Sequence, residues 1–382
     1  MRTADVVHLC YGGFGGHMTV VNTLSKELRM RGLTTGVVAV APENEIECSK
    51  ESWPGALWVE PLILSRTSRL LDYRAAARMS RTVKSAAVLA HTHRIVPGWM
   101  IGRPLNHRRT PLIVVEHHAW NDRRITDEAW SLSALAFADG LVFLSLESRD
   151  HYRLWPAARV RQVATRIVPN GIDTLIFRPG ENRRSIGPLH VGTVGRLVRG
   201  KDFGLVLDAV AMARSEGMNL RLMIAGQGPE YASLRDRTVS LGLTDVVHFV
   251  GEVRAQDMPE FLRGLDVFVH ASKGETLSMA LLEAAAAQLP IVACSVPGVK
   301  NIYTDGVDAL LVPPNDASAL AAAIRKAADP AVATLLGANA RRLVEENYSS
   351  TRMAEGYLEL LRIVAPSGPW GPSAVGAQRQ AP

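Results

Sequence analysis

Short apolar runs alternate along almost the whole chain with longer stretches of helical periodicity. Residues 6–11 form one such run, and a glycine-rich loop leads from it into a helix-like stretch at about residues 17–31. The same order returns at residues 190–194 and 202–215, again with a glycine-containing loop between them. A strand, a glycine loop and a helix in this order are typical of parallel sheets covered by helices. The pattern therefore predicts two Rossmann-like α/β domains in tandem.

The domain boundary is expected near a polar stretch at residues 177–185, which contains a Pro-Gly pair. We predict a first domain at residues 1–180 and a second at residues 181–349, a division that suits a chain of 382 residues. Residues 350–364 have the pattern of an amphipathic helix, which we expect to pack back on the first domain. Residues 365–382 are rich in Pro, Gly, Ala and Ser and are predicted to be a disordered tail.

Composition places the chain among globular proteins, with 47% apolar and 21% charged residues. No apolar run approaches the roughly 18 residues that span a bilayer, and no signal-peptide pattern opens the chain, so we expect a cytoplasmic protein. Cys10, Cys48 and Cys294 show no paired spacing, which favours reduced, buried thiols over a disulfide framework or a zinc site.

Positive charge is concentrated in one segment. Between residues 61 and 124 there are twelve Lys and Arg residues against three Asp and Glu residues, whereas the whole chain has a formal net charge of +6. Such a patch can bind anionic lipid or a phosphate-bearing acceptor, or it can be a solvated helical face. Peripheral contact with the inner membrane face is therefore one hypothesis.

Two glutamates, Glu275 and Glu283, bracket seven residues where a predicted strand turns into a predicted helix. If that interval were wholly helical, the carboxylates would lie about 12 Å apart along the axis. Glycosidase acid/base pairs are separated by only about 5 to 9.5 Å, so this pair is better suited to holding two ends of one extended ligand. The alternative is a helix N-terminal charge at Glu275 and a surface position for Glu283.

Phosphate-binding groups are predicted in the same half of the chain. The amides of Thr276, Leu277 and Ser278 are expected at a helix N-terminus, which favours an anion. Arg196 and Lys201 lie in the second glycine loop, where two cations near a helix start are unfavourable unless an anion joins them. Solvated surface cations are the alternative.

The first glycine loop is a weaker signal. Gly15 and Gly16 would let the backbone approach a phosphate closely, because glycine has no Cβ. The dinucleotide fingerprint fails at its last glycine, where Met18 stands, which disfavours a nicotinamide oxidoreductase. No Asp-x-Asp triplet occurs, so no metal-clamped diphosphate site is expected.

Several of these stretches resemble glycosyltransferase family 4. The two glutamates and the strand before them are similar to its E-x7-E signature, and the match runs from about Val6 to Tyr357. The resemblance implies the GT-B fold, with two Rossmann-like domains facing a central cleft, the first on the acceptor side and the second for the nucleotide sugar. The other matching stretches are the first glycine loop and residues 169–173, 194–197 with Lys201, 224–229 and 248–251.

The activity that this resemblance implies is retaining, metal-independent hexosyl transfer from a nucleotide-diphosphate sugar to an acceptor hydroxyl. UDP- or GDP-sugars are the expected donors, and no cofactor or nucleic acid is expected. The acceptor would be a sugar, a lipid-linked molecule or a small molecule in envelope polysaccharide, glycolipid or small glycoside biosynthesis.

Site residues follow from the same resemblance. Glu283 would hold the ribose hydroxyls and Glu275 the donor sugar, with Arg196 and Lys201 on the diphosphate. Backbone groups around Gly251 and Val253 would contact the base. The family has an active-site histidine after the strand at residues 112–116, for which we favour His117 over His118.

Some interpretations remain open. Many family members have Gly-Phe-Gly after the first glutamate, where this chain has Thr-Leu-Ser, a departure that alters the wall near the donor sugar. His91 and His93, at the end of the preceding strand, are interpreted as structural. The rival functions are a nucleotide-sugar epimerase of similar architecture and a non-catalytic sugar-binding protein.

Overall fold

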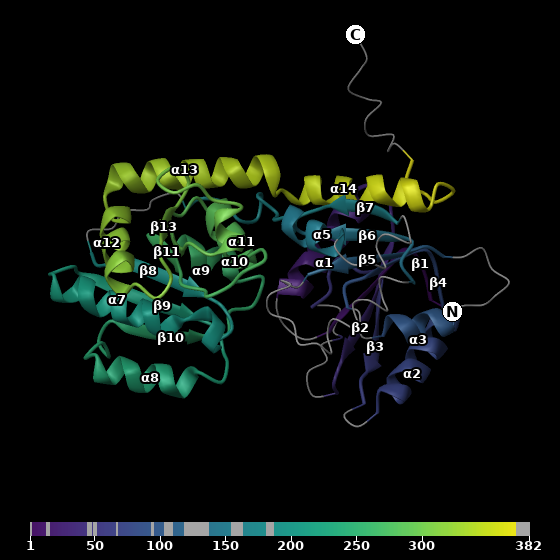
Figure 1. Ribbon diagram of the computed structural model, residues 1–382, viewed down its shortest axis with the longest axis horizontal. Helices are drawn as coiled ribbons and strands as arrows, with labels where there is room; N and C mark the ends of the chain where they lie inside the picture. The colour runs from purple at the N-terminus through teal and green to yellow at the C-terminus, as the bar shows by residue number, and fades with distance from the viewer. Residues whose placement is uncertain are drawn as a thin grey trace, which may run out of the picture. The chain divides into compact units, whose positions relative to one another are not determined.

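The protein is described from a computed structural model, in which two compact α/β units are formed (Figure 1). One unit comprises Met1–Gly171 and Ser350–Pro382, and the other comprises Ile172–Ser349. Each unit is built on its own parallel sheet, which confirms the predicted fold class of two parallel α/β domains. The described residues are 2–12, 16–43, 48, 52–65, 68–92, 95–102, 110–117, 137–153, 163–180 and 187–371.

The first unit contains a seven-stranded sheet in the order β3-β2-β1-β4-β5-β6-β7, with every pairing parallel. Strands β2, β5 and β6 are buried along their whole length, as expected where helices cover both faces of a parallel sheet. The elements are β1 (Arg2–Tyr11), α1 (Gly16–Met30), β2 (Thr35–Ala41), β3 (Trp58–Ile63), α2 (Arg69–Thr82), β4 (Val83–Ala90), α3 (Val96–Ile101), β5 (Leu112–Glu116), β6 (Gly140–Phe143), α5 (Leu146–Arg153), β7 (Ala164–Ile167) and α14 (Ser350–Val364).

The second unit contains a six-stranded parallel sheet in the order β10-β9-β8-β11-β12-β13. Its core strands β11 and β12 are fully buried. The elements are β8 (Leu189–Val194), a 3-10 turn (Arg199–Lys201), α7 (Phe203–Ser215), β9 (Leu220–Ala225), α8 (Tyr231–Ser240), β10 (Val247–Gly251), α9 (Met258–Arg263), β11 (Val267–His270), α10 (Met279–Ala286), β12 (Ile291–Cys294), α11 (Pro297–Lys300), β13 (Leu310–Val312), α12 (Ala317–Ala327) and α13 (Pro330–Asn347).

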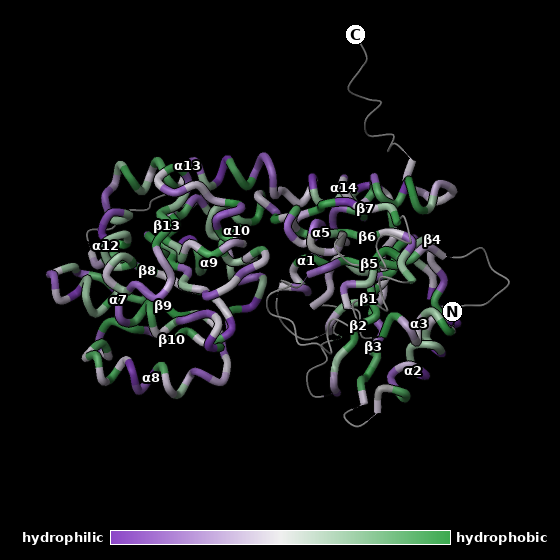
Figure 2. The backbone as a smooth tube through the Cα atoms, viewed as in Figure 1, coloured by the Kyte–Doolittle hydropathy of each residue, from purple (hydrophilic) through white to green (hydrophobic). Residues whose placement is uncertain are grey.

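Strand order reverses once in each sheet, between β1 and β4 and between β8 and β11. In open α/β sheets ligands bind beyond the carboxyl ends of the strands at such a reversal. Figure 2 colours each residue by its hydropathy. The residues of the central strands are apolar, and the outer faces of the helices are polar. Each unit therefore offers one topologically favoured ligand position.

The boundary between the two units lies between residues 171 and 172, earlier in the chain than the boundary predicted from the polar stretch at residues 177–185. Residues 172–180 belong to the second unit, although the sequence placed them in the first. The amide of Ile172 donates to the carbonyl of Tyr348 at 2.8 Å, and the Arg341 guanidinium donates to the carbonyl of Phe177 at 3.2 Å. These bonds to α13 and to the residue that follows it hold the segment to the second unit, and composition alone cannot show them.

Helix α14 belongs to the first unit, where it contacts α1 and β7. The Ser350 hydroxyl at its start donates to Glu27 on α1 at 2.6 Å. After the helix, Trp370 is only 2% exposed, and its indole N–H donates to the carbonyl of Ala365 at 2.7 Å. The predicted disordered tail is therefore wrong for residues 365–371, because a buried indole anchors them. Residues 372–382 lie outside the described part of the chain.

None of the helices that the structure describes combines the length and the apolar character needed to cross a bilayer. Cys10 and Cys294 are buried free thiols, and Cys48 is partly buried.

Candidate active site

The E-x7-E segment lies at the strand reversal of the second unit. Strand β11 pairs with β8 on one side and β12 on the other, and it ends at His270. Helix α10 begins only at Met279, and Ser278 is its N-cap with extended backbone and no side-chain cap bond. Thr276 and Leu277 therefore precede the helix, and the expectation that all three amides lie at its N-terminus is wrong for these two.

A network of loop hydrogen bonds joins this segment to the second glycine loop. The Ser272 hydroxyl donates to the carbonyl of Gly274 at 2.7 Å and lies 3.2 Å from that of Gly200. The amide of Lys273 donates to the same Gly200 carbonyl at 2.8 Å. Because Lys201 follows Gly200 directly, these bonds hold the lysine side chain beside Glu275.

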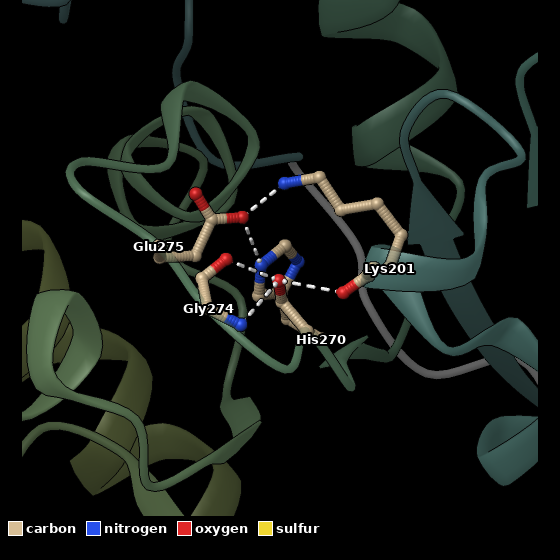
Figure 3. Close-up of polar contacts among 6 residues, drawn as sticks. Lys201, His270, Gly274 and Glu275 are labelled. Carbon is tan, nitrogen blue, oxygen red and sulfur yellow. Dashed lines mark hydrogen bonds and ion pairs between the residues drawn. The ribbon is translucent and has the colours of Figure 1, made fainter. Parts of the chain in front are cut away.

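Glu275 is the centre of a polar cluster with Lys201 and His270 (Figure 3). Its Oε1 atom accepts a hydrogen bond from the Lys201 ammonium and lies 3.0 Å from Nε2 of His270. Burial alone would raise the pKa of Glu275, but the His270 hydrogen bond and the Lys201 charge outweigh it and lower the pKa to about 2. Glu275 is therefore ionised at neutral pH, and only its Oε2 atom is left for a ligand.

His270 is a residue that the sequence reasoning missed. It is 3% exposed, and burial lowers its pKa, although the hydrogen bond to Glu275 opposes this effect. A neutral imidazole beside an ionised carboxylate donates from the nitrogen nearest to it, here Nε2. The sequence does contain a signal for this role, because His270 lies at the carboxyl end of a predicted buried strand, five residues before Glu275.

Glu283 lies on α10 and is 8% exposed, which excludes the alternative of a surface position. Its side chain has no hydrogen-bond partner among the residues that the structure describes. Burial raises the pKa of Glu283 to about 8. A buried carboxyl group without a partner is costly, and such groups are concentrated at functional sites.

Three strand ends of the second unit converge through glycines. A Cβ on Gly226 would overlap the carbonyl oxygen of Gly195, and the amide of Gly226 donates to the carbonyl of Gly251 at 2.7 Å. Gly251 has a φ of +79°, in the region that favours glycine. Val253, two residues later, packs against the core of this unit. Arg196 is exposed, and its side chain has no partner within the described residues.

Histidines gather at the strand reversal of the first unit. His8 lies on β1, His91 follows β4 and His117 follows β5. Nδ1 of His8 lies 3.2 Å from Nε2 of His91, whose Nδ1 lies 2.9 Å from Nε2 of His117. The ring of His17, on α1, packs 4.7 Å from the ring of His117 between centroids. His93 and His118 lie outside the described residues.

Comparison with known proteins identifies the family. Residues 14–174 match the family model described as Glycosyltransferase Family 4, and residues 188–329 match that of Glycosyl transferases group 1. The chain belongs to glycosyltransferase family 4. It is therefore an enzyme that transfers a sugar from a nucleotide-sugar donor, and nothing supports the epimerase alternative.

Two relatives of this glycosyltransferase span most of its length. A D-inositol 3-phosphate glycosyltransferase from Acidothermus cellulolyticus is 29% identical over 84% of this chain and 79% of the relative. A D-inositol 3-phosphate glycosyltransferase from Saccharomonospora viridis is 28% identical over 91% of this chain and 89% of the relative.

Solved structures of similar fold include HepE from Anabaena in complex with UDP and glucose. It has a TM-score of 0.78 at 20% identity and covers 94% of this chain and 99% of HepE. Sucrose-phosphate synthase from Thermosynechococcus elongatus has a TM-score of 0.77 at 20% identity, over 96% of this chain and 100% of that protein. These matches confirm the GT-B fold class.

The structure of this glycosyltransferase brings some predicted site residues together. Lys201 and Glu275 share an ion pair, and Gly251 lies beside the glycines of neighbouring strand ends. Gly16 begins α1, whereas Gly15 lies outside the described residues. No group of three or more His, Cys, Asp or Glu side chains suited to a metal ion occurs in the described ranges.

Proposed function

We propose that this enzyme binds a nucleotide-diphosphate sugar at the β8/β11 strand reversal of its second unit, with the ribose hydroxyls on Glu283. The observation that carries the proposal is the buried, unpartnered Glu283 carboxyl on α10, the helix that follows the Lys201–Glu275 pair. A vicinal diol supplies the two hydrogen-bond donors that this carboxyl group lacks. A bound donor would therefore supply hydrogen bonds to the Glu283 carboxyl group, whose burial is unfavourable when the site is empty.

Lys201 and Arg196 neutralise the diphosphate in this proposal. Lys201 is already held at the site by Glu275, whereas Arg196 is exposed and free to turn toward an incoming anion. Glu275 offers Oε2 to a hydroxyl of the donor sugar, because its other oxygen is occupied by Lys201 and His270. His270 thereby orients the carboxylate. Preorganised charges of this kind stabilise the negative charge that grows on the leaving group.

The reaction is proposed to retain the anomeric configuration. The acceptor hydroxyl attacks from the side on which the diphosphate leaves, and a departing phosphate oxygen takes its proton. No protein base is required, which agrees with the occupied Oε1 of Glu275. His117 is proposed as an active-site residue of the first unit, and the clamp of Lys201 and Arg196 in the second unit is proposed to replace a metal ion.

UDP is the donor nucleotide that we propose. HepE is described in complexes with UDP and with UDP-glucose, and the pneumococcal O-GlcNAc transferase GtfA in a complex with UDP and GlcNAc. The backbone around Gly251 and Val253 is proposed to contact the uracil. Thr276, Leu277 and Ser278 are proposed to line the donor side.

For the acceptor we propose a hydroxyl of a sugar or polyol, in biosynthesis of a polysaccharide, glycolipid or small glycoside. The relatives named above act on D-inositol 3-phosphate, and a further relative from Rhizobium meliloti, matched over 45% of this chain, is a lipopolysaccharide core biosynthesis glycosyltransferase.

Kinetics of site variants test the donor assignment. Glu283→Ala is expected to raise the KM for the nucleotide sugar, because the ribose contact is made equally in the ground state and the transition state. Arg196→Ala and Lys201→Ala are expected to lower kcat, by about 100-fold, because their contacts strengthen as charge develops. Wild-type turnover in either cation variant would refute the phosphate assignment.

A screen of nucleotide sugars identifies the donor and separates the rival functions. A ligand at 100 times its Kd raises the free energy of unfolding by about 2.7 kcal/mol, which a thermal-shift assay detects. Purified enzyme and donor without acceptor should give at most slow hydrolysis. An epimerised nucleotide sugar would indicate the epimerase, and stabilisation without any product in the presence of acceptors would indicate a binding protein.

We also propose peripheral contact with an anionic membrane through α2. Its exposed face carries Arg74, Arg78 and Arg81, and Leu70 and Leu71 are 59% and 51% exposed at its start. Cations and apolar side chains on one helical face are the combination that binds anionic lipid surfaces.

Cosedimentation with vesicles tests this contact. Binding to vesicles that contain phosphatidylserine is expected at low salt and should weaken in the triple variant of Arg74, Arg78 and Arg81 to Gln. The matched control replaces Arg235, Arg254 and Arg352, three exposed arginines outside α2, by Gln. Equal binding of both variants would contradict the role of α2.

A further inference from the structure

Asp202, the residue after Lys201, has an unusual backbone conformation for an aspartate at a helix start. It follows the 3-10 turn and is the N-cap of α7, and its φ of +44° and ψ of +47° lie in the left-handed region. An N-cap residue ordinarily has extended backbone. Aspartate tolerates the left-handed region better than most residues, yet glycine adopts it without the cost of a Cβ. What the aspartate contributes at this position must therefore come from its carboxylate.

The carboxylate of Asp202 does not cap α7. It accepts no hydrogen bond from the first amides of that helix. By contrast, Asp316 and Asp329 have extended backbone and accept hydrogen bonds from the amides that start α12 and α13. Oδ2 of Asp202 instead lies 3.2 Å from Nζ of Lys273. Asp202 therefore forms an ion pair with the loop that carries Glu275, in place of a helix cap.

Lys273 holds the second glycine loop at two points, one on each side of Lys201. Its amide donates to the carbonyl of Gly200 at 2.8 Å, and its ammonium group pairs with Asp202. Lys201 lies between these two contacts, and its own ammonium group bonds Oε1 of Glu275 (Figure 3). A side chain whose backbone is fixed on both sides has less freedom to lose when it binds, so its charge is better preorganised.

We propose that Asp202 is a positioning residue, whose carboxylate, bound to Lys273, fixes the backbone that directs Lys201 toward the diphosphate of the donor. The inference rests on the proposed place of Lys201 at that diphosphate. Asp202 acts through Lys201 and makes no contact with the donor itself. Lys273 also neutralises the carboxylate, which would otherwise repel the bound anion.

Kinetics of Asp202 variants test this role. Asp202→Gly suits the backbone conformation and removes the carboxylate, so kcat should fall about fivefold at an unchanged or higher Tm. Asp202→Asn also tolerates the left-handed region and keeps an oxygen that accepts from Lys273, so it should retain kcat within about twofold. The matched control is Asn315→Gly, at an exposed position with a φ of +62°, which should leave kcat unchanged. Wild-type kcat in Asp202→Gly, or equal losses in Asp202→Gly and Asp202→Asn, would overturn the proposal.

Double variants show whether Asp202 acts through the two lysines. Asp202→Gly should lower kcat no further in a Lys201→Ala background, and no further in a Lys273→Ala background, because each background already lacks one of the connected contacts. A loss caused only by the flexibility of a new glycine would persist in the Lys273→Ala background. Additive losses in either background would therefore overturn the positioning role.

The placement of Lys201 is also measured without any donor. Reductive methylation of the native enzyme, followed by peptide mass spectrometry, gives the reactivity of each lysine, with the exposed Lys326 as the reference. An ammonium group bonded to a carboxylate is less reactive than a free one, so Asp202→Gly should raise the reactivity of Lys201 by about threefold and Asn315→Gly should not. Unchanged reactivity of Lys201 in Asp202→Gly would overturn the proposal. Wild-type turnover in Lys201→Ala would instead refute the proposed diphosphate role of Lys201, independently of the labelling.

Discussion

Glu283 makes the stability of the unliganded enzyme depend on pH in an unusual direction. In the folded protein the pKa of Glu283 is raised from 4.5 to about 8 by burial. Between these values the folded state holds a proton that the unfolded state has released. Stability therefore falls as pH rises through this window, and below about pH 4.5 Glu283 has no effect.

The size of the effect follows from the width of the window. Each pKa unit corresponds to about 1.36 kcal/mol, so ionised Glu283 destabilises the empty enzyme by about 5 kcal/mol above pH 8, as an upper bound. Glu283→Gln removes the titration and keeps the shape of the side chain. The Tm of the variant should thus exceed that of the wild type increasingly between pH 5 and 8.5. At the upper end of this pH range the difference in Tm should reach at most about 10 to 20 °C, because each kcal/mol shifts the Tm by about 2 to 4 °C for a unit of this size.

The assay is thermal unfolding of both proteins across this pH range. Glu275→Gln is the matched control, because the pKa of Glu275 is lowered to about 2 by His270 and Lys201 against the effect of burial. Glu275 therefore stabilises the fold above about pH 4.5 and loses this contribution only as pH falls toward 2, so this variant should lose the same stability at every pH from 5 to 8.5. UDP should raise the Tm of the wild type more at pH 8.5 than at pH 6, because ribose hydroxyls favour the ionised carboxyl group. Parallel curves for wild type and Glu283→Gln would refute the reasoning.

Two further variants test the packing around the site and the C-terminal segment. A Cβ on Gly298 would overlap the backbone carbonyl of Glu275, so Gly298→Ala should displace that loop and lower kcat by about 100-fold. The control is Gly264→Ala, which should leave kcat unchanged because its Cβ would lie at ordinary contact distance from its neighbours. Trp370→Ala should lower the free energy of unfolding by about 3 to 5 kcal/mol, because it leaves a cavity where the indole is buried. The control Ile363→Ala, at an exposed position of α14, should change it by less than about 0.5 kcal/mol. Urea unfolding measures both values, and equal effects would contradict the anchoring role of Trp370.

Much of the architecture could be read from local sequence patterns. Apolar runs of strand length, glycine loops and helical periodicity predicted two parallel α/β units, because these signals depend on neighbours within a few residues. The two glutamates were found in the same way, since their spacing lies within one strand-to-helix segment. The helix start was misplaced by the same local reasoning, because Ser278 has no cap bond that a sequence pattern would reveal.

Contacts between distant residues were decided only by the tertiary structure. The hydrogen-bond partners of His270, His8 and His91 lie on other strands and loops. The periodicity of the sequence does not predict such partners. The burial of Glu283 and its raised pKa depend on the packing around α10. The segment at residues 172–180 joined the second unit through bonds to α13 and Tyr348, although its composition is that of a linker.

By itself, the sequence determined the order of strands and helices, the two-unit plan and the identity of the paired acids, because each is encoded in residues close together along the chain. The tertiary structure decided which charged side chains form ion pairs and which polar atoms are buried away from water. Both depend on segments that are remote in sequence and adjacent in a parallel sheet. The electrostatic character of the site is thus a property of the packed strand ends.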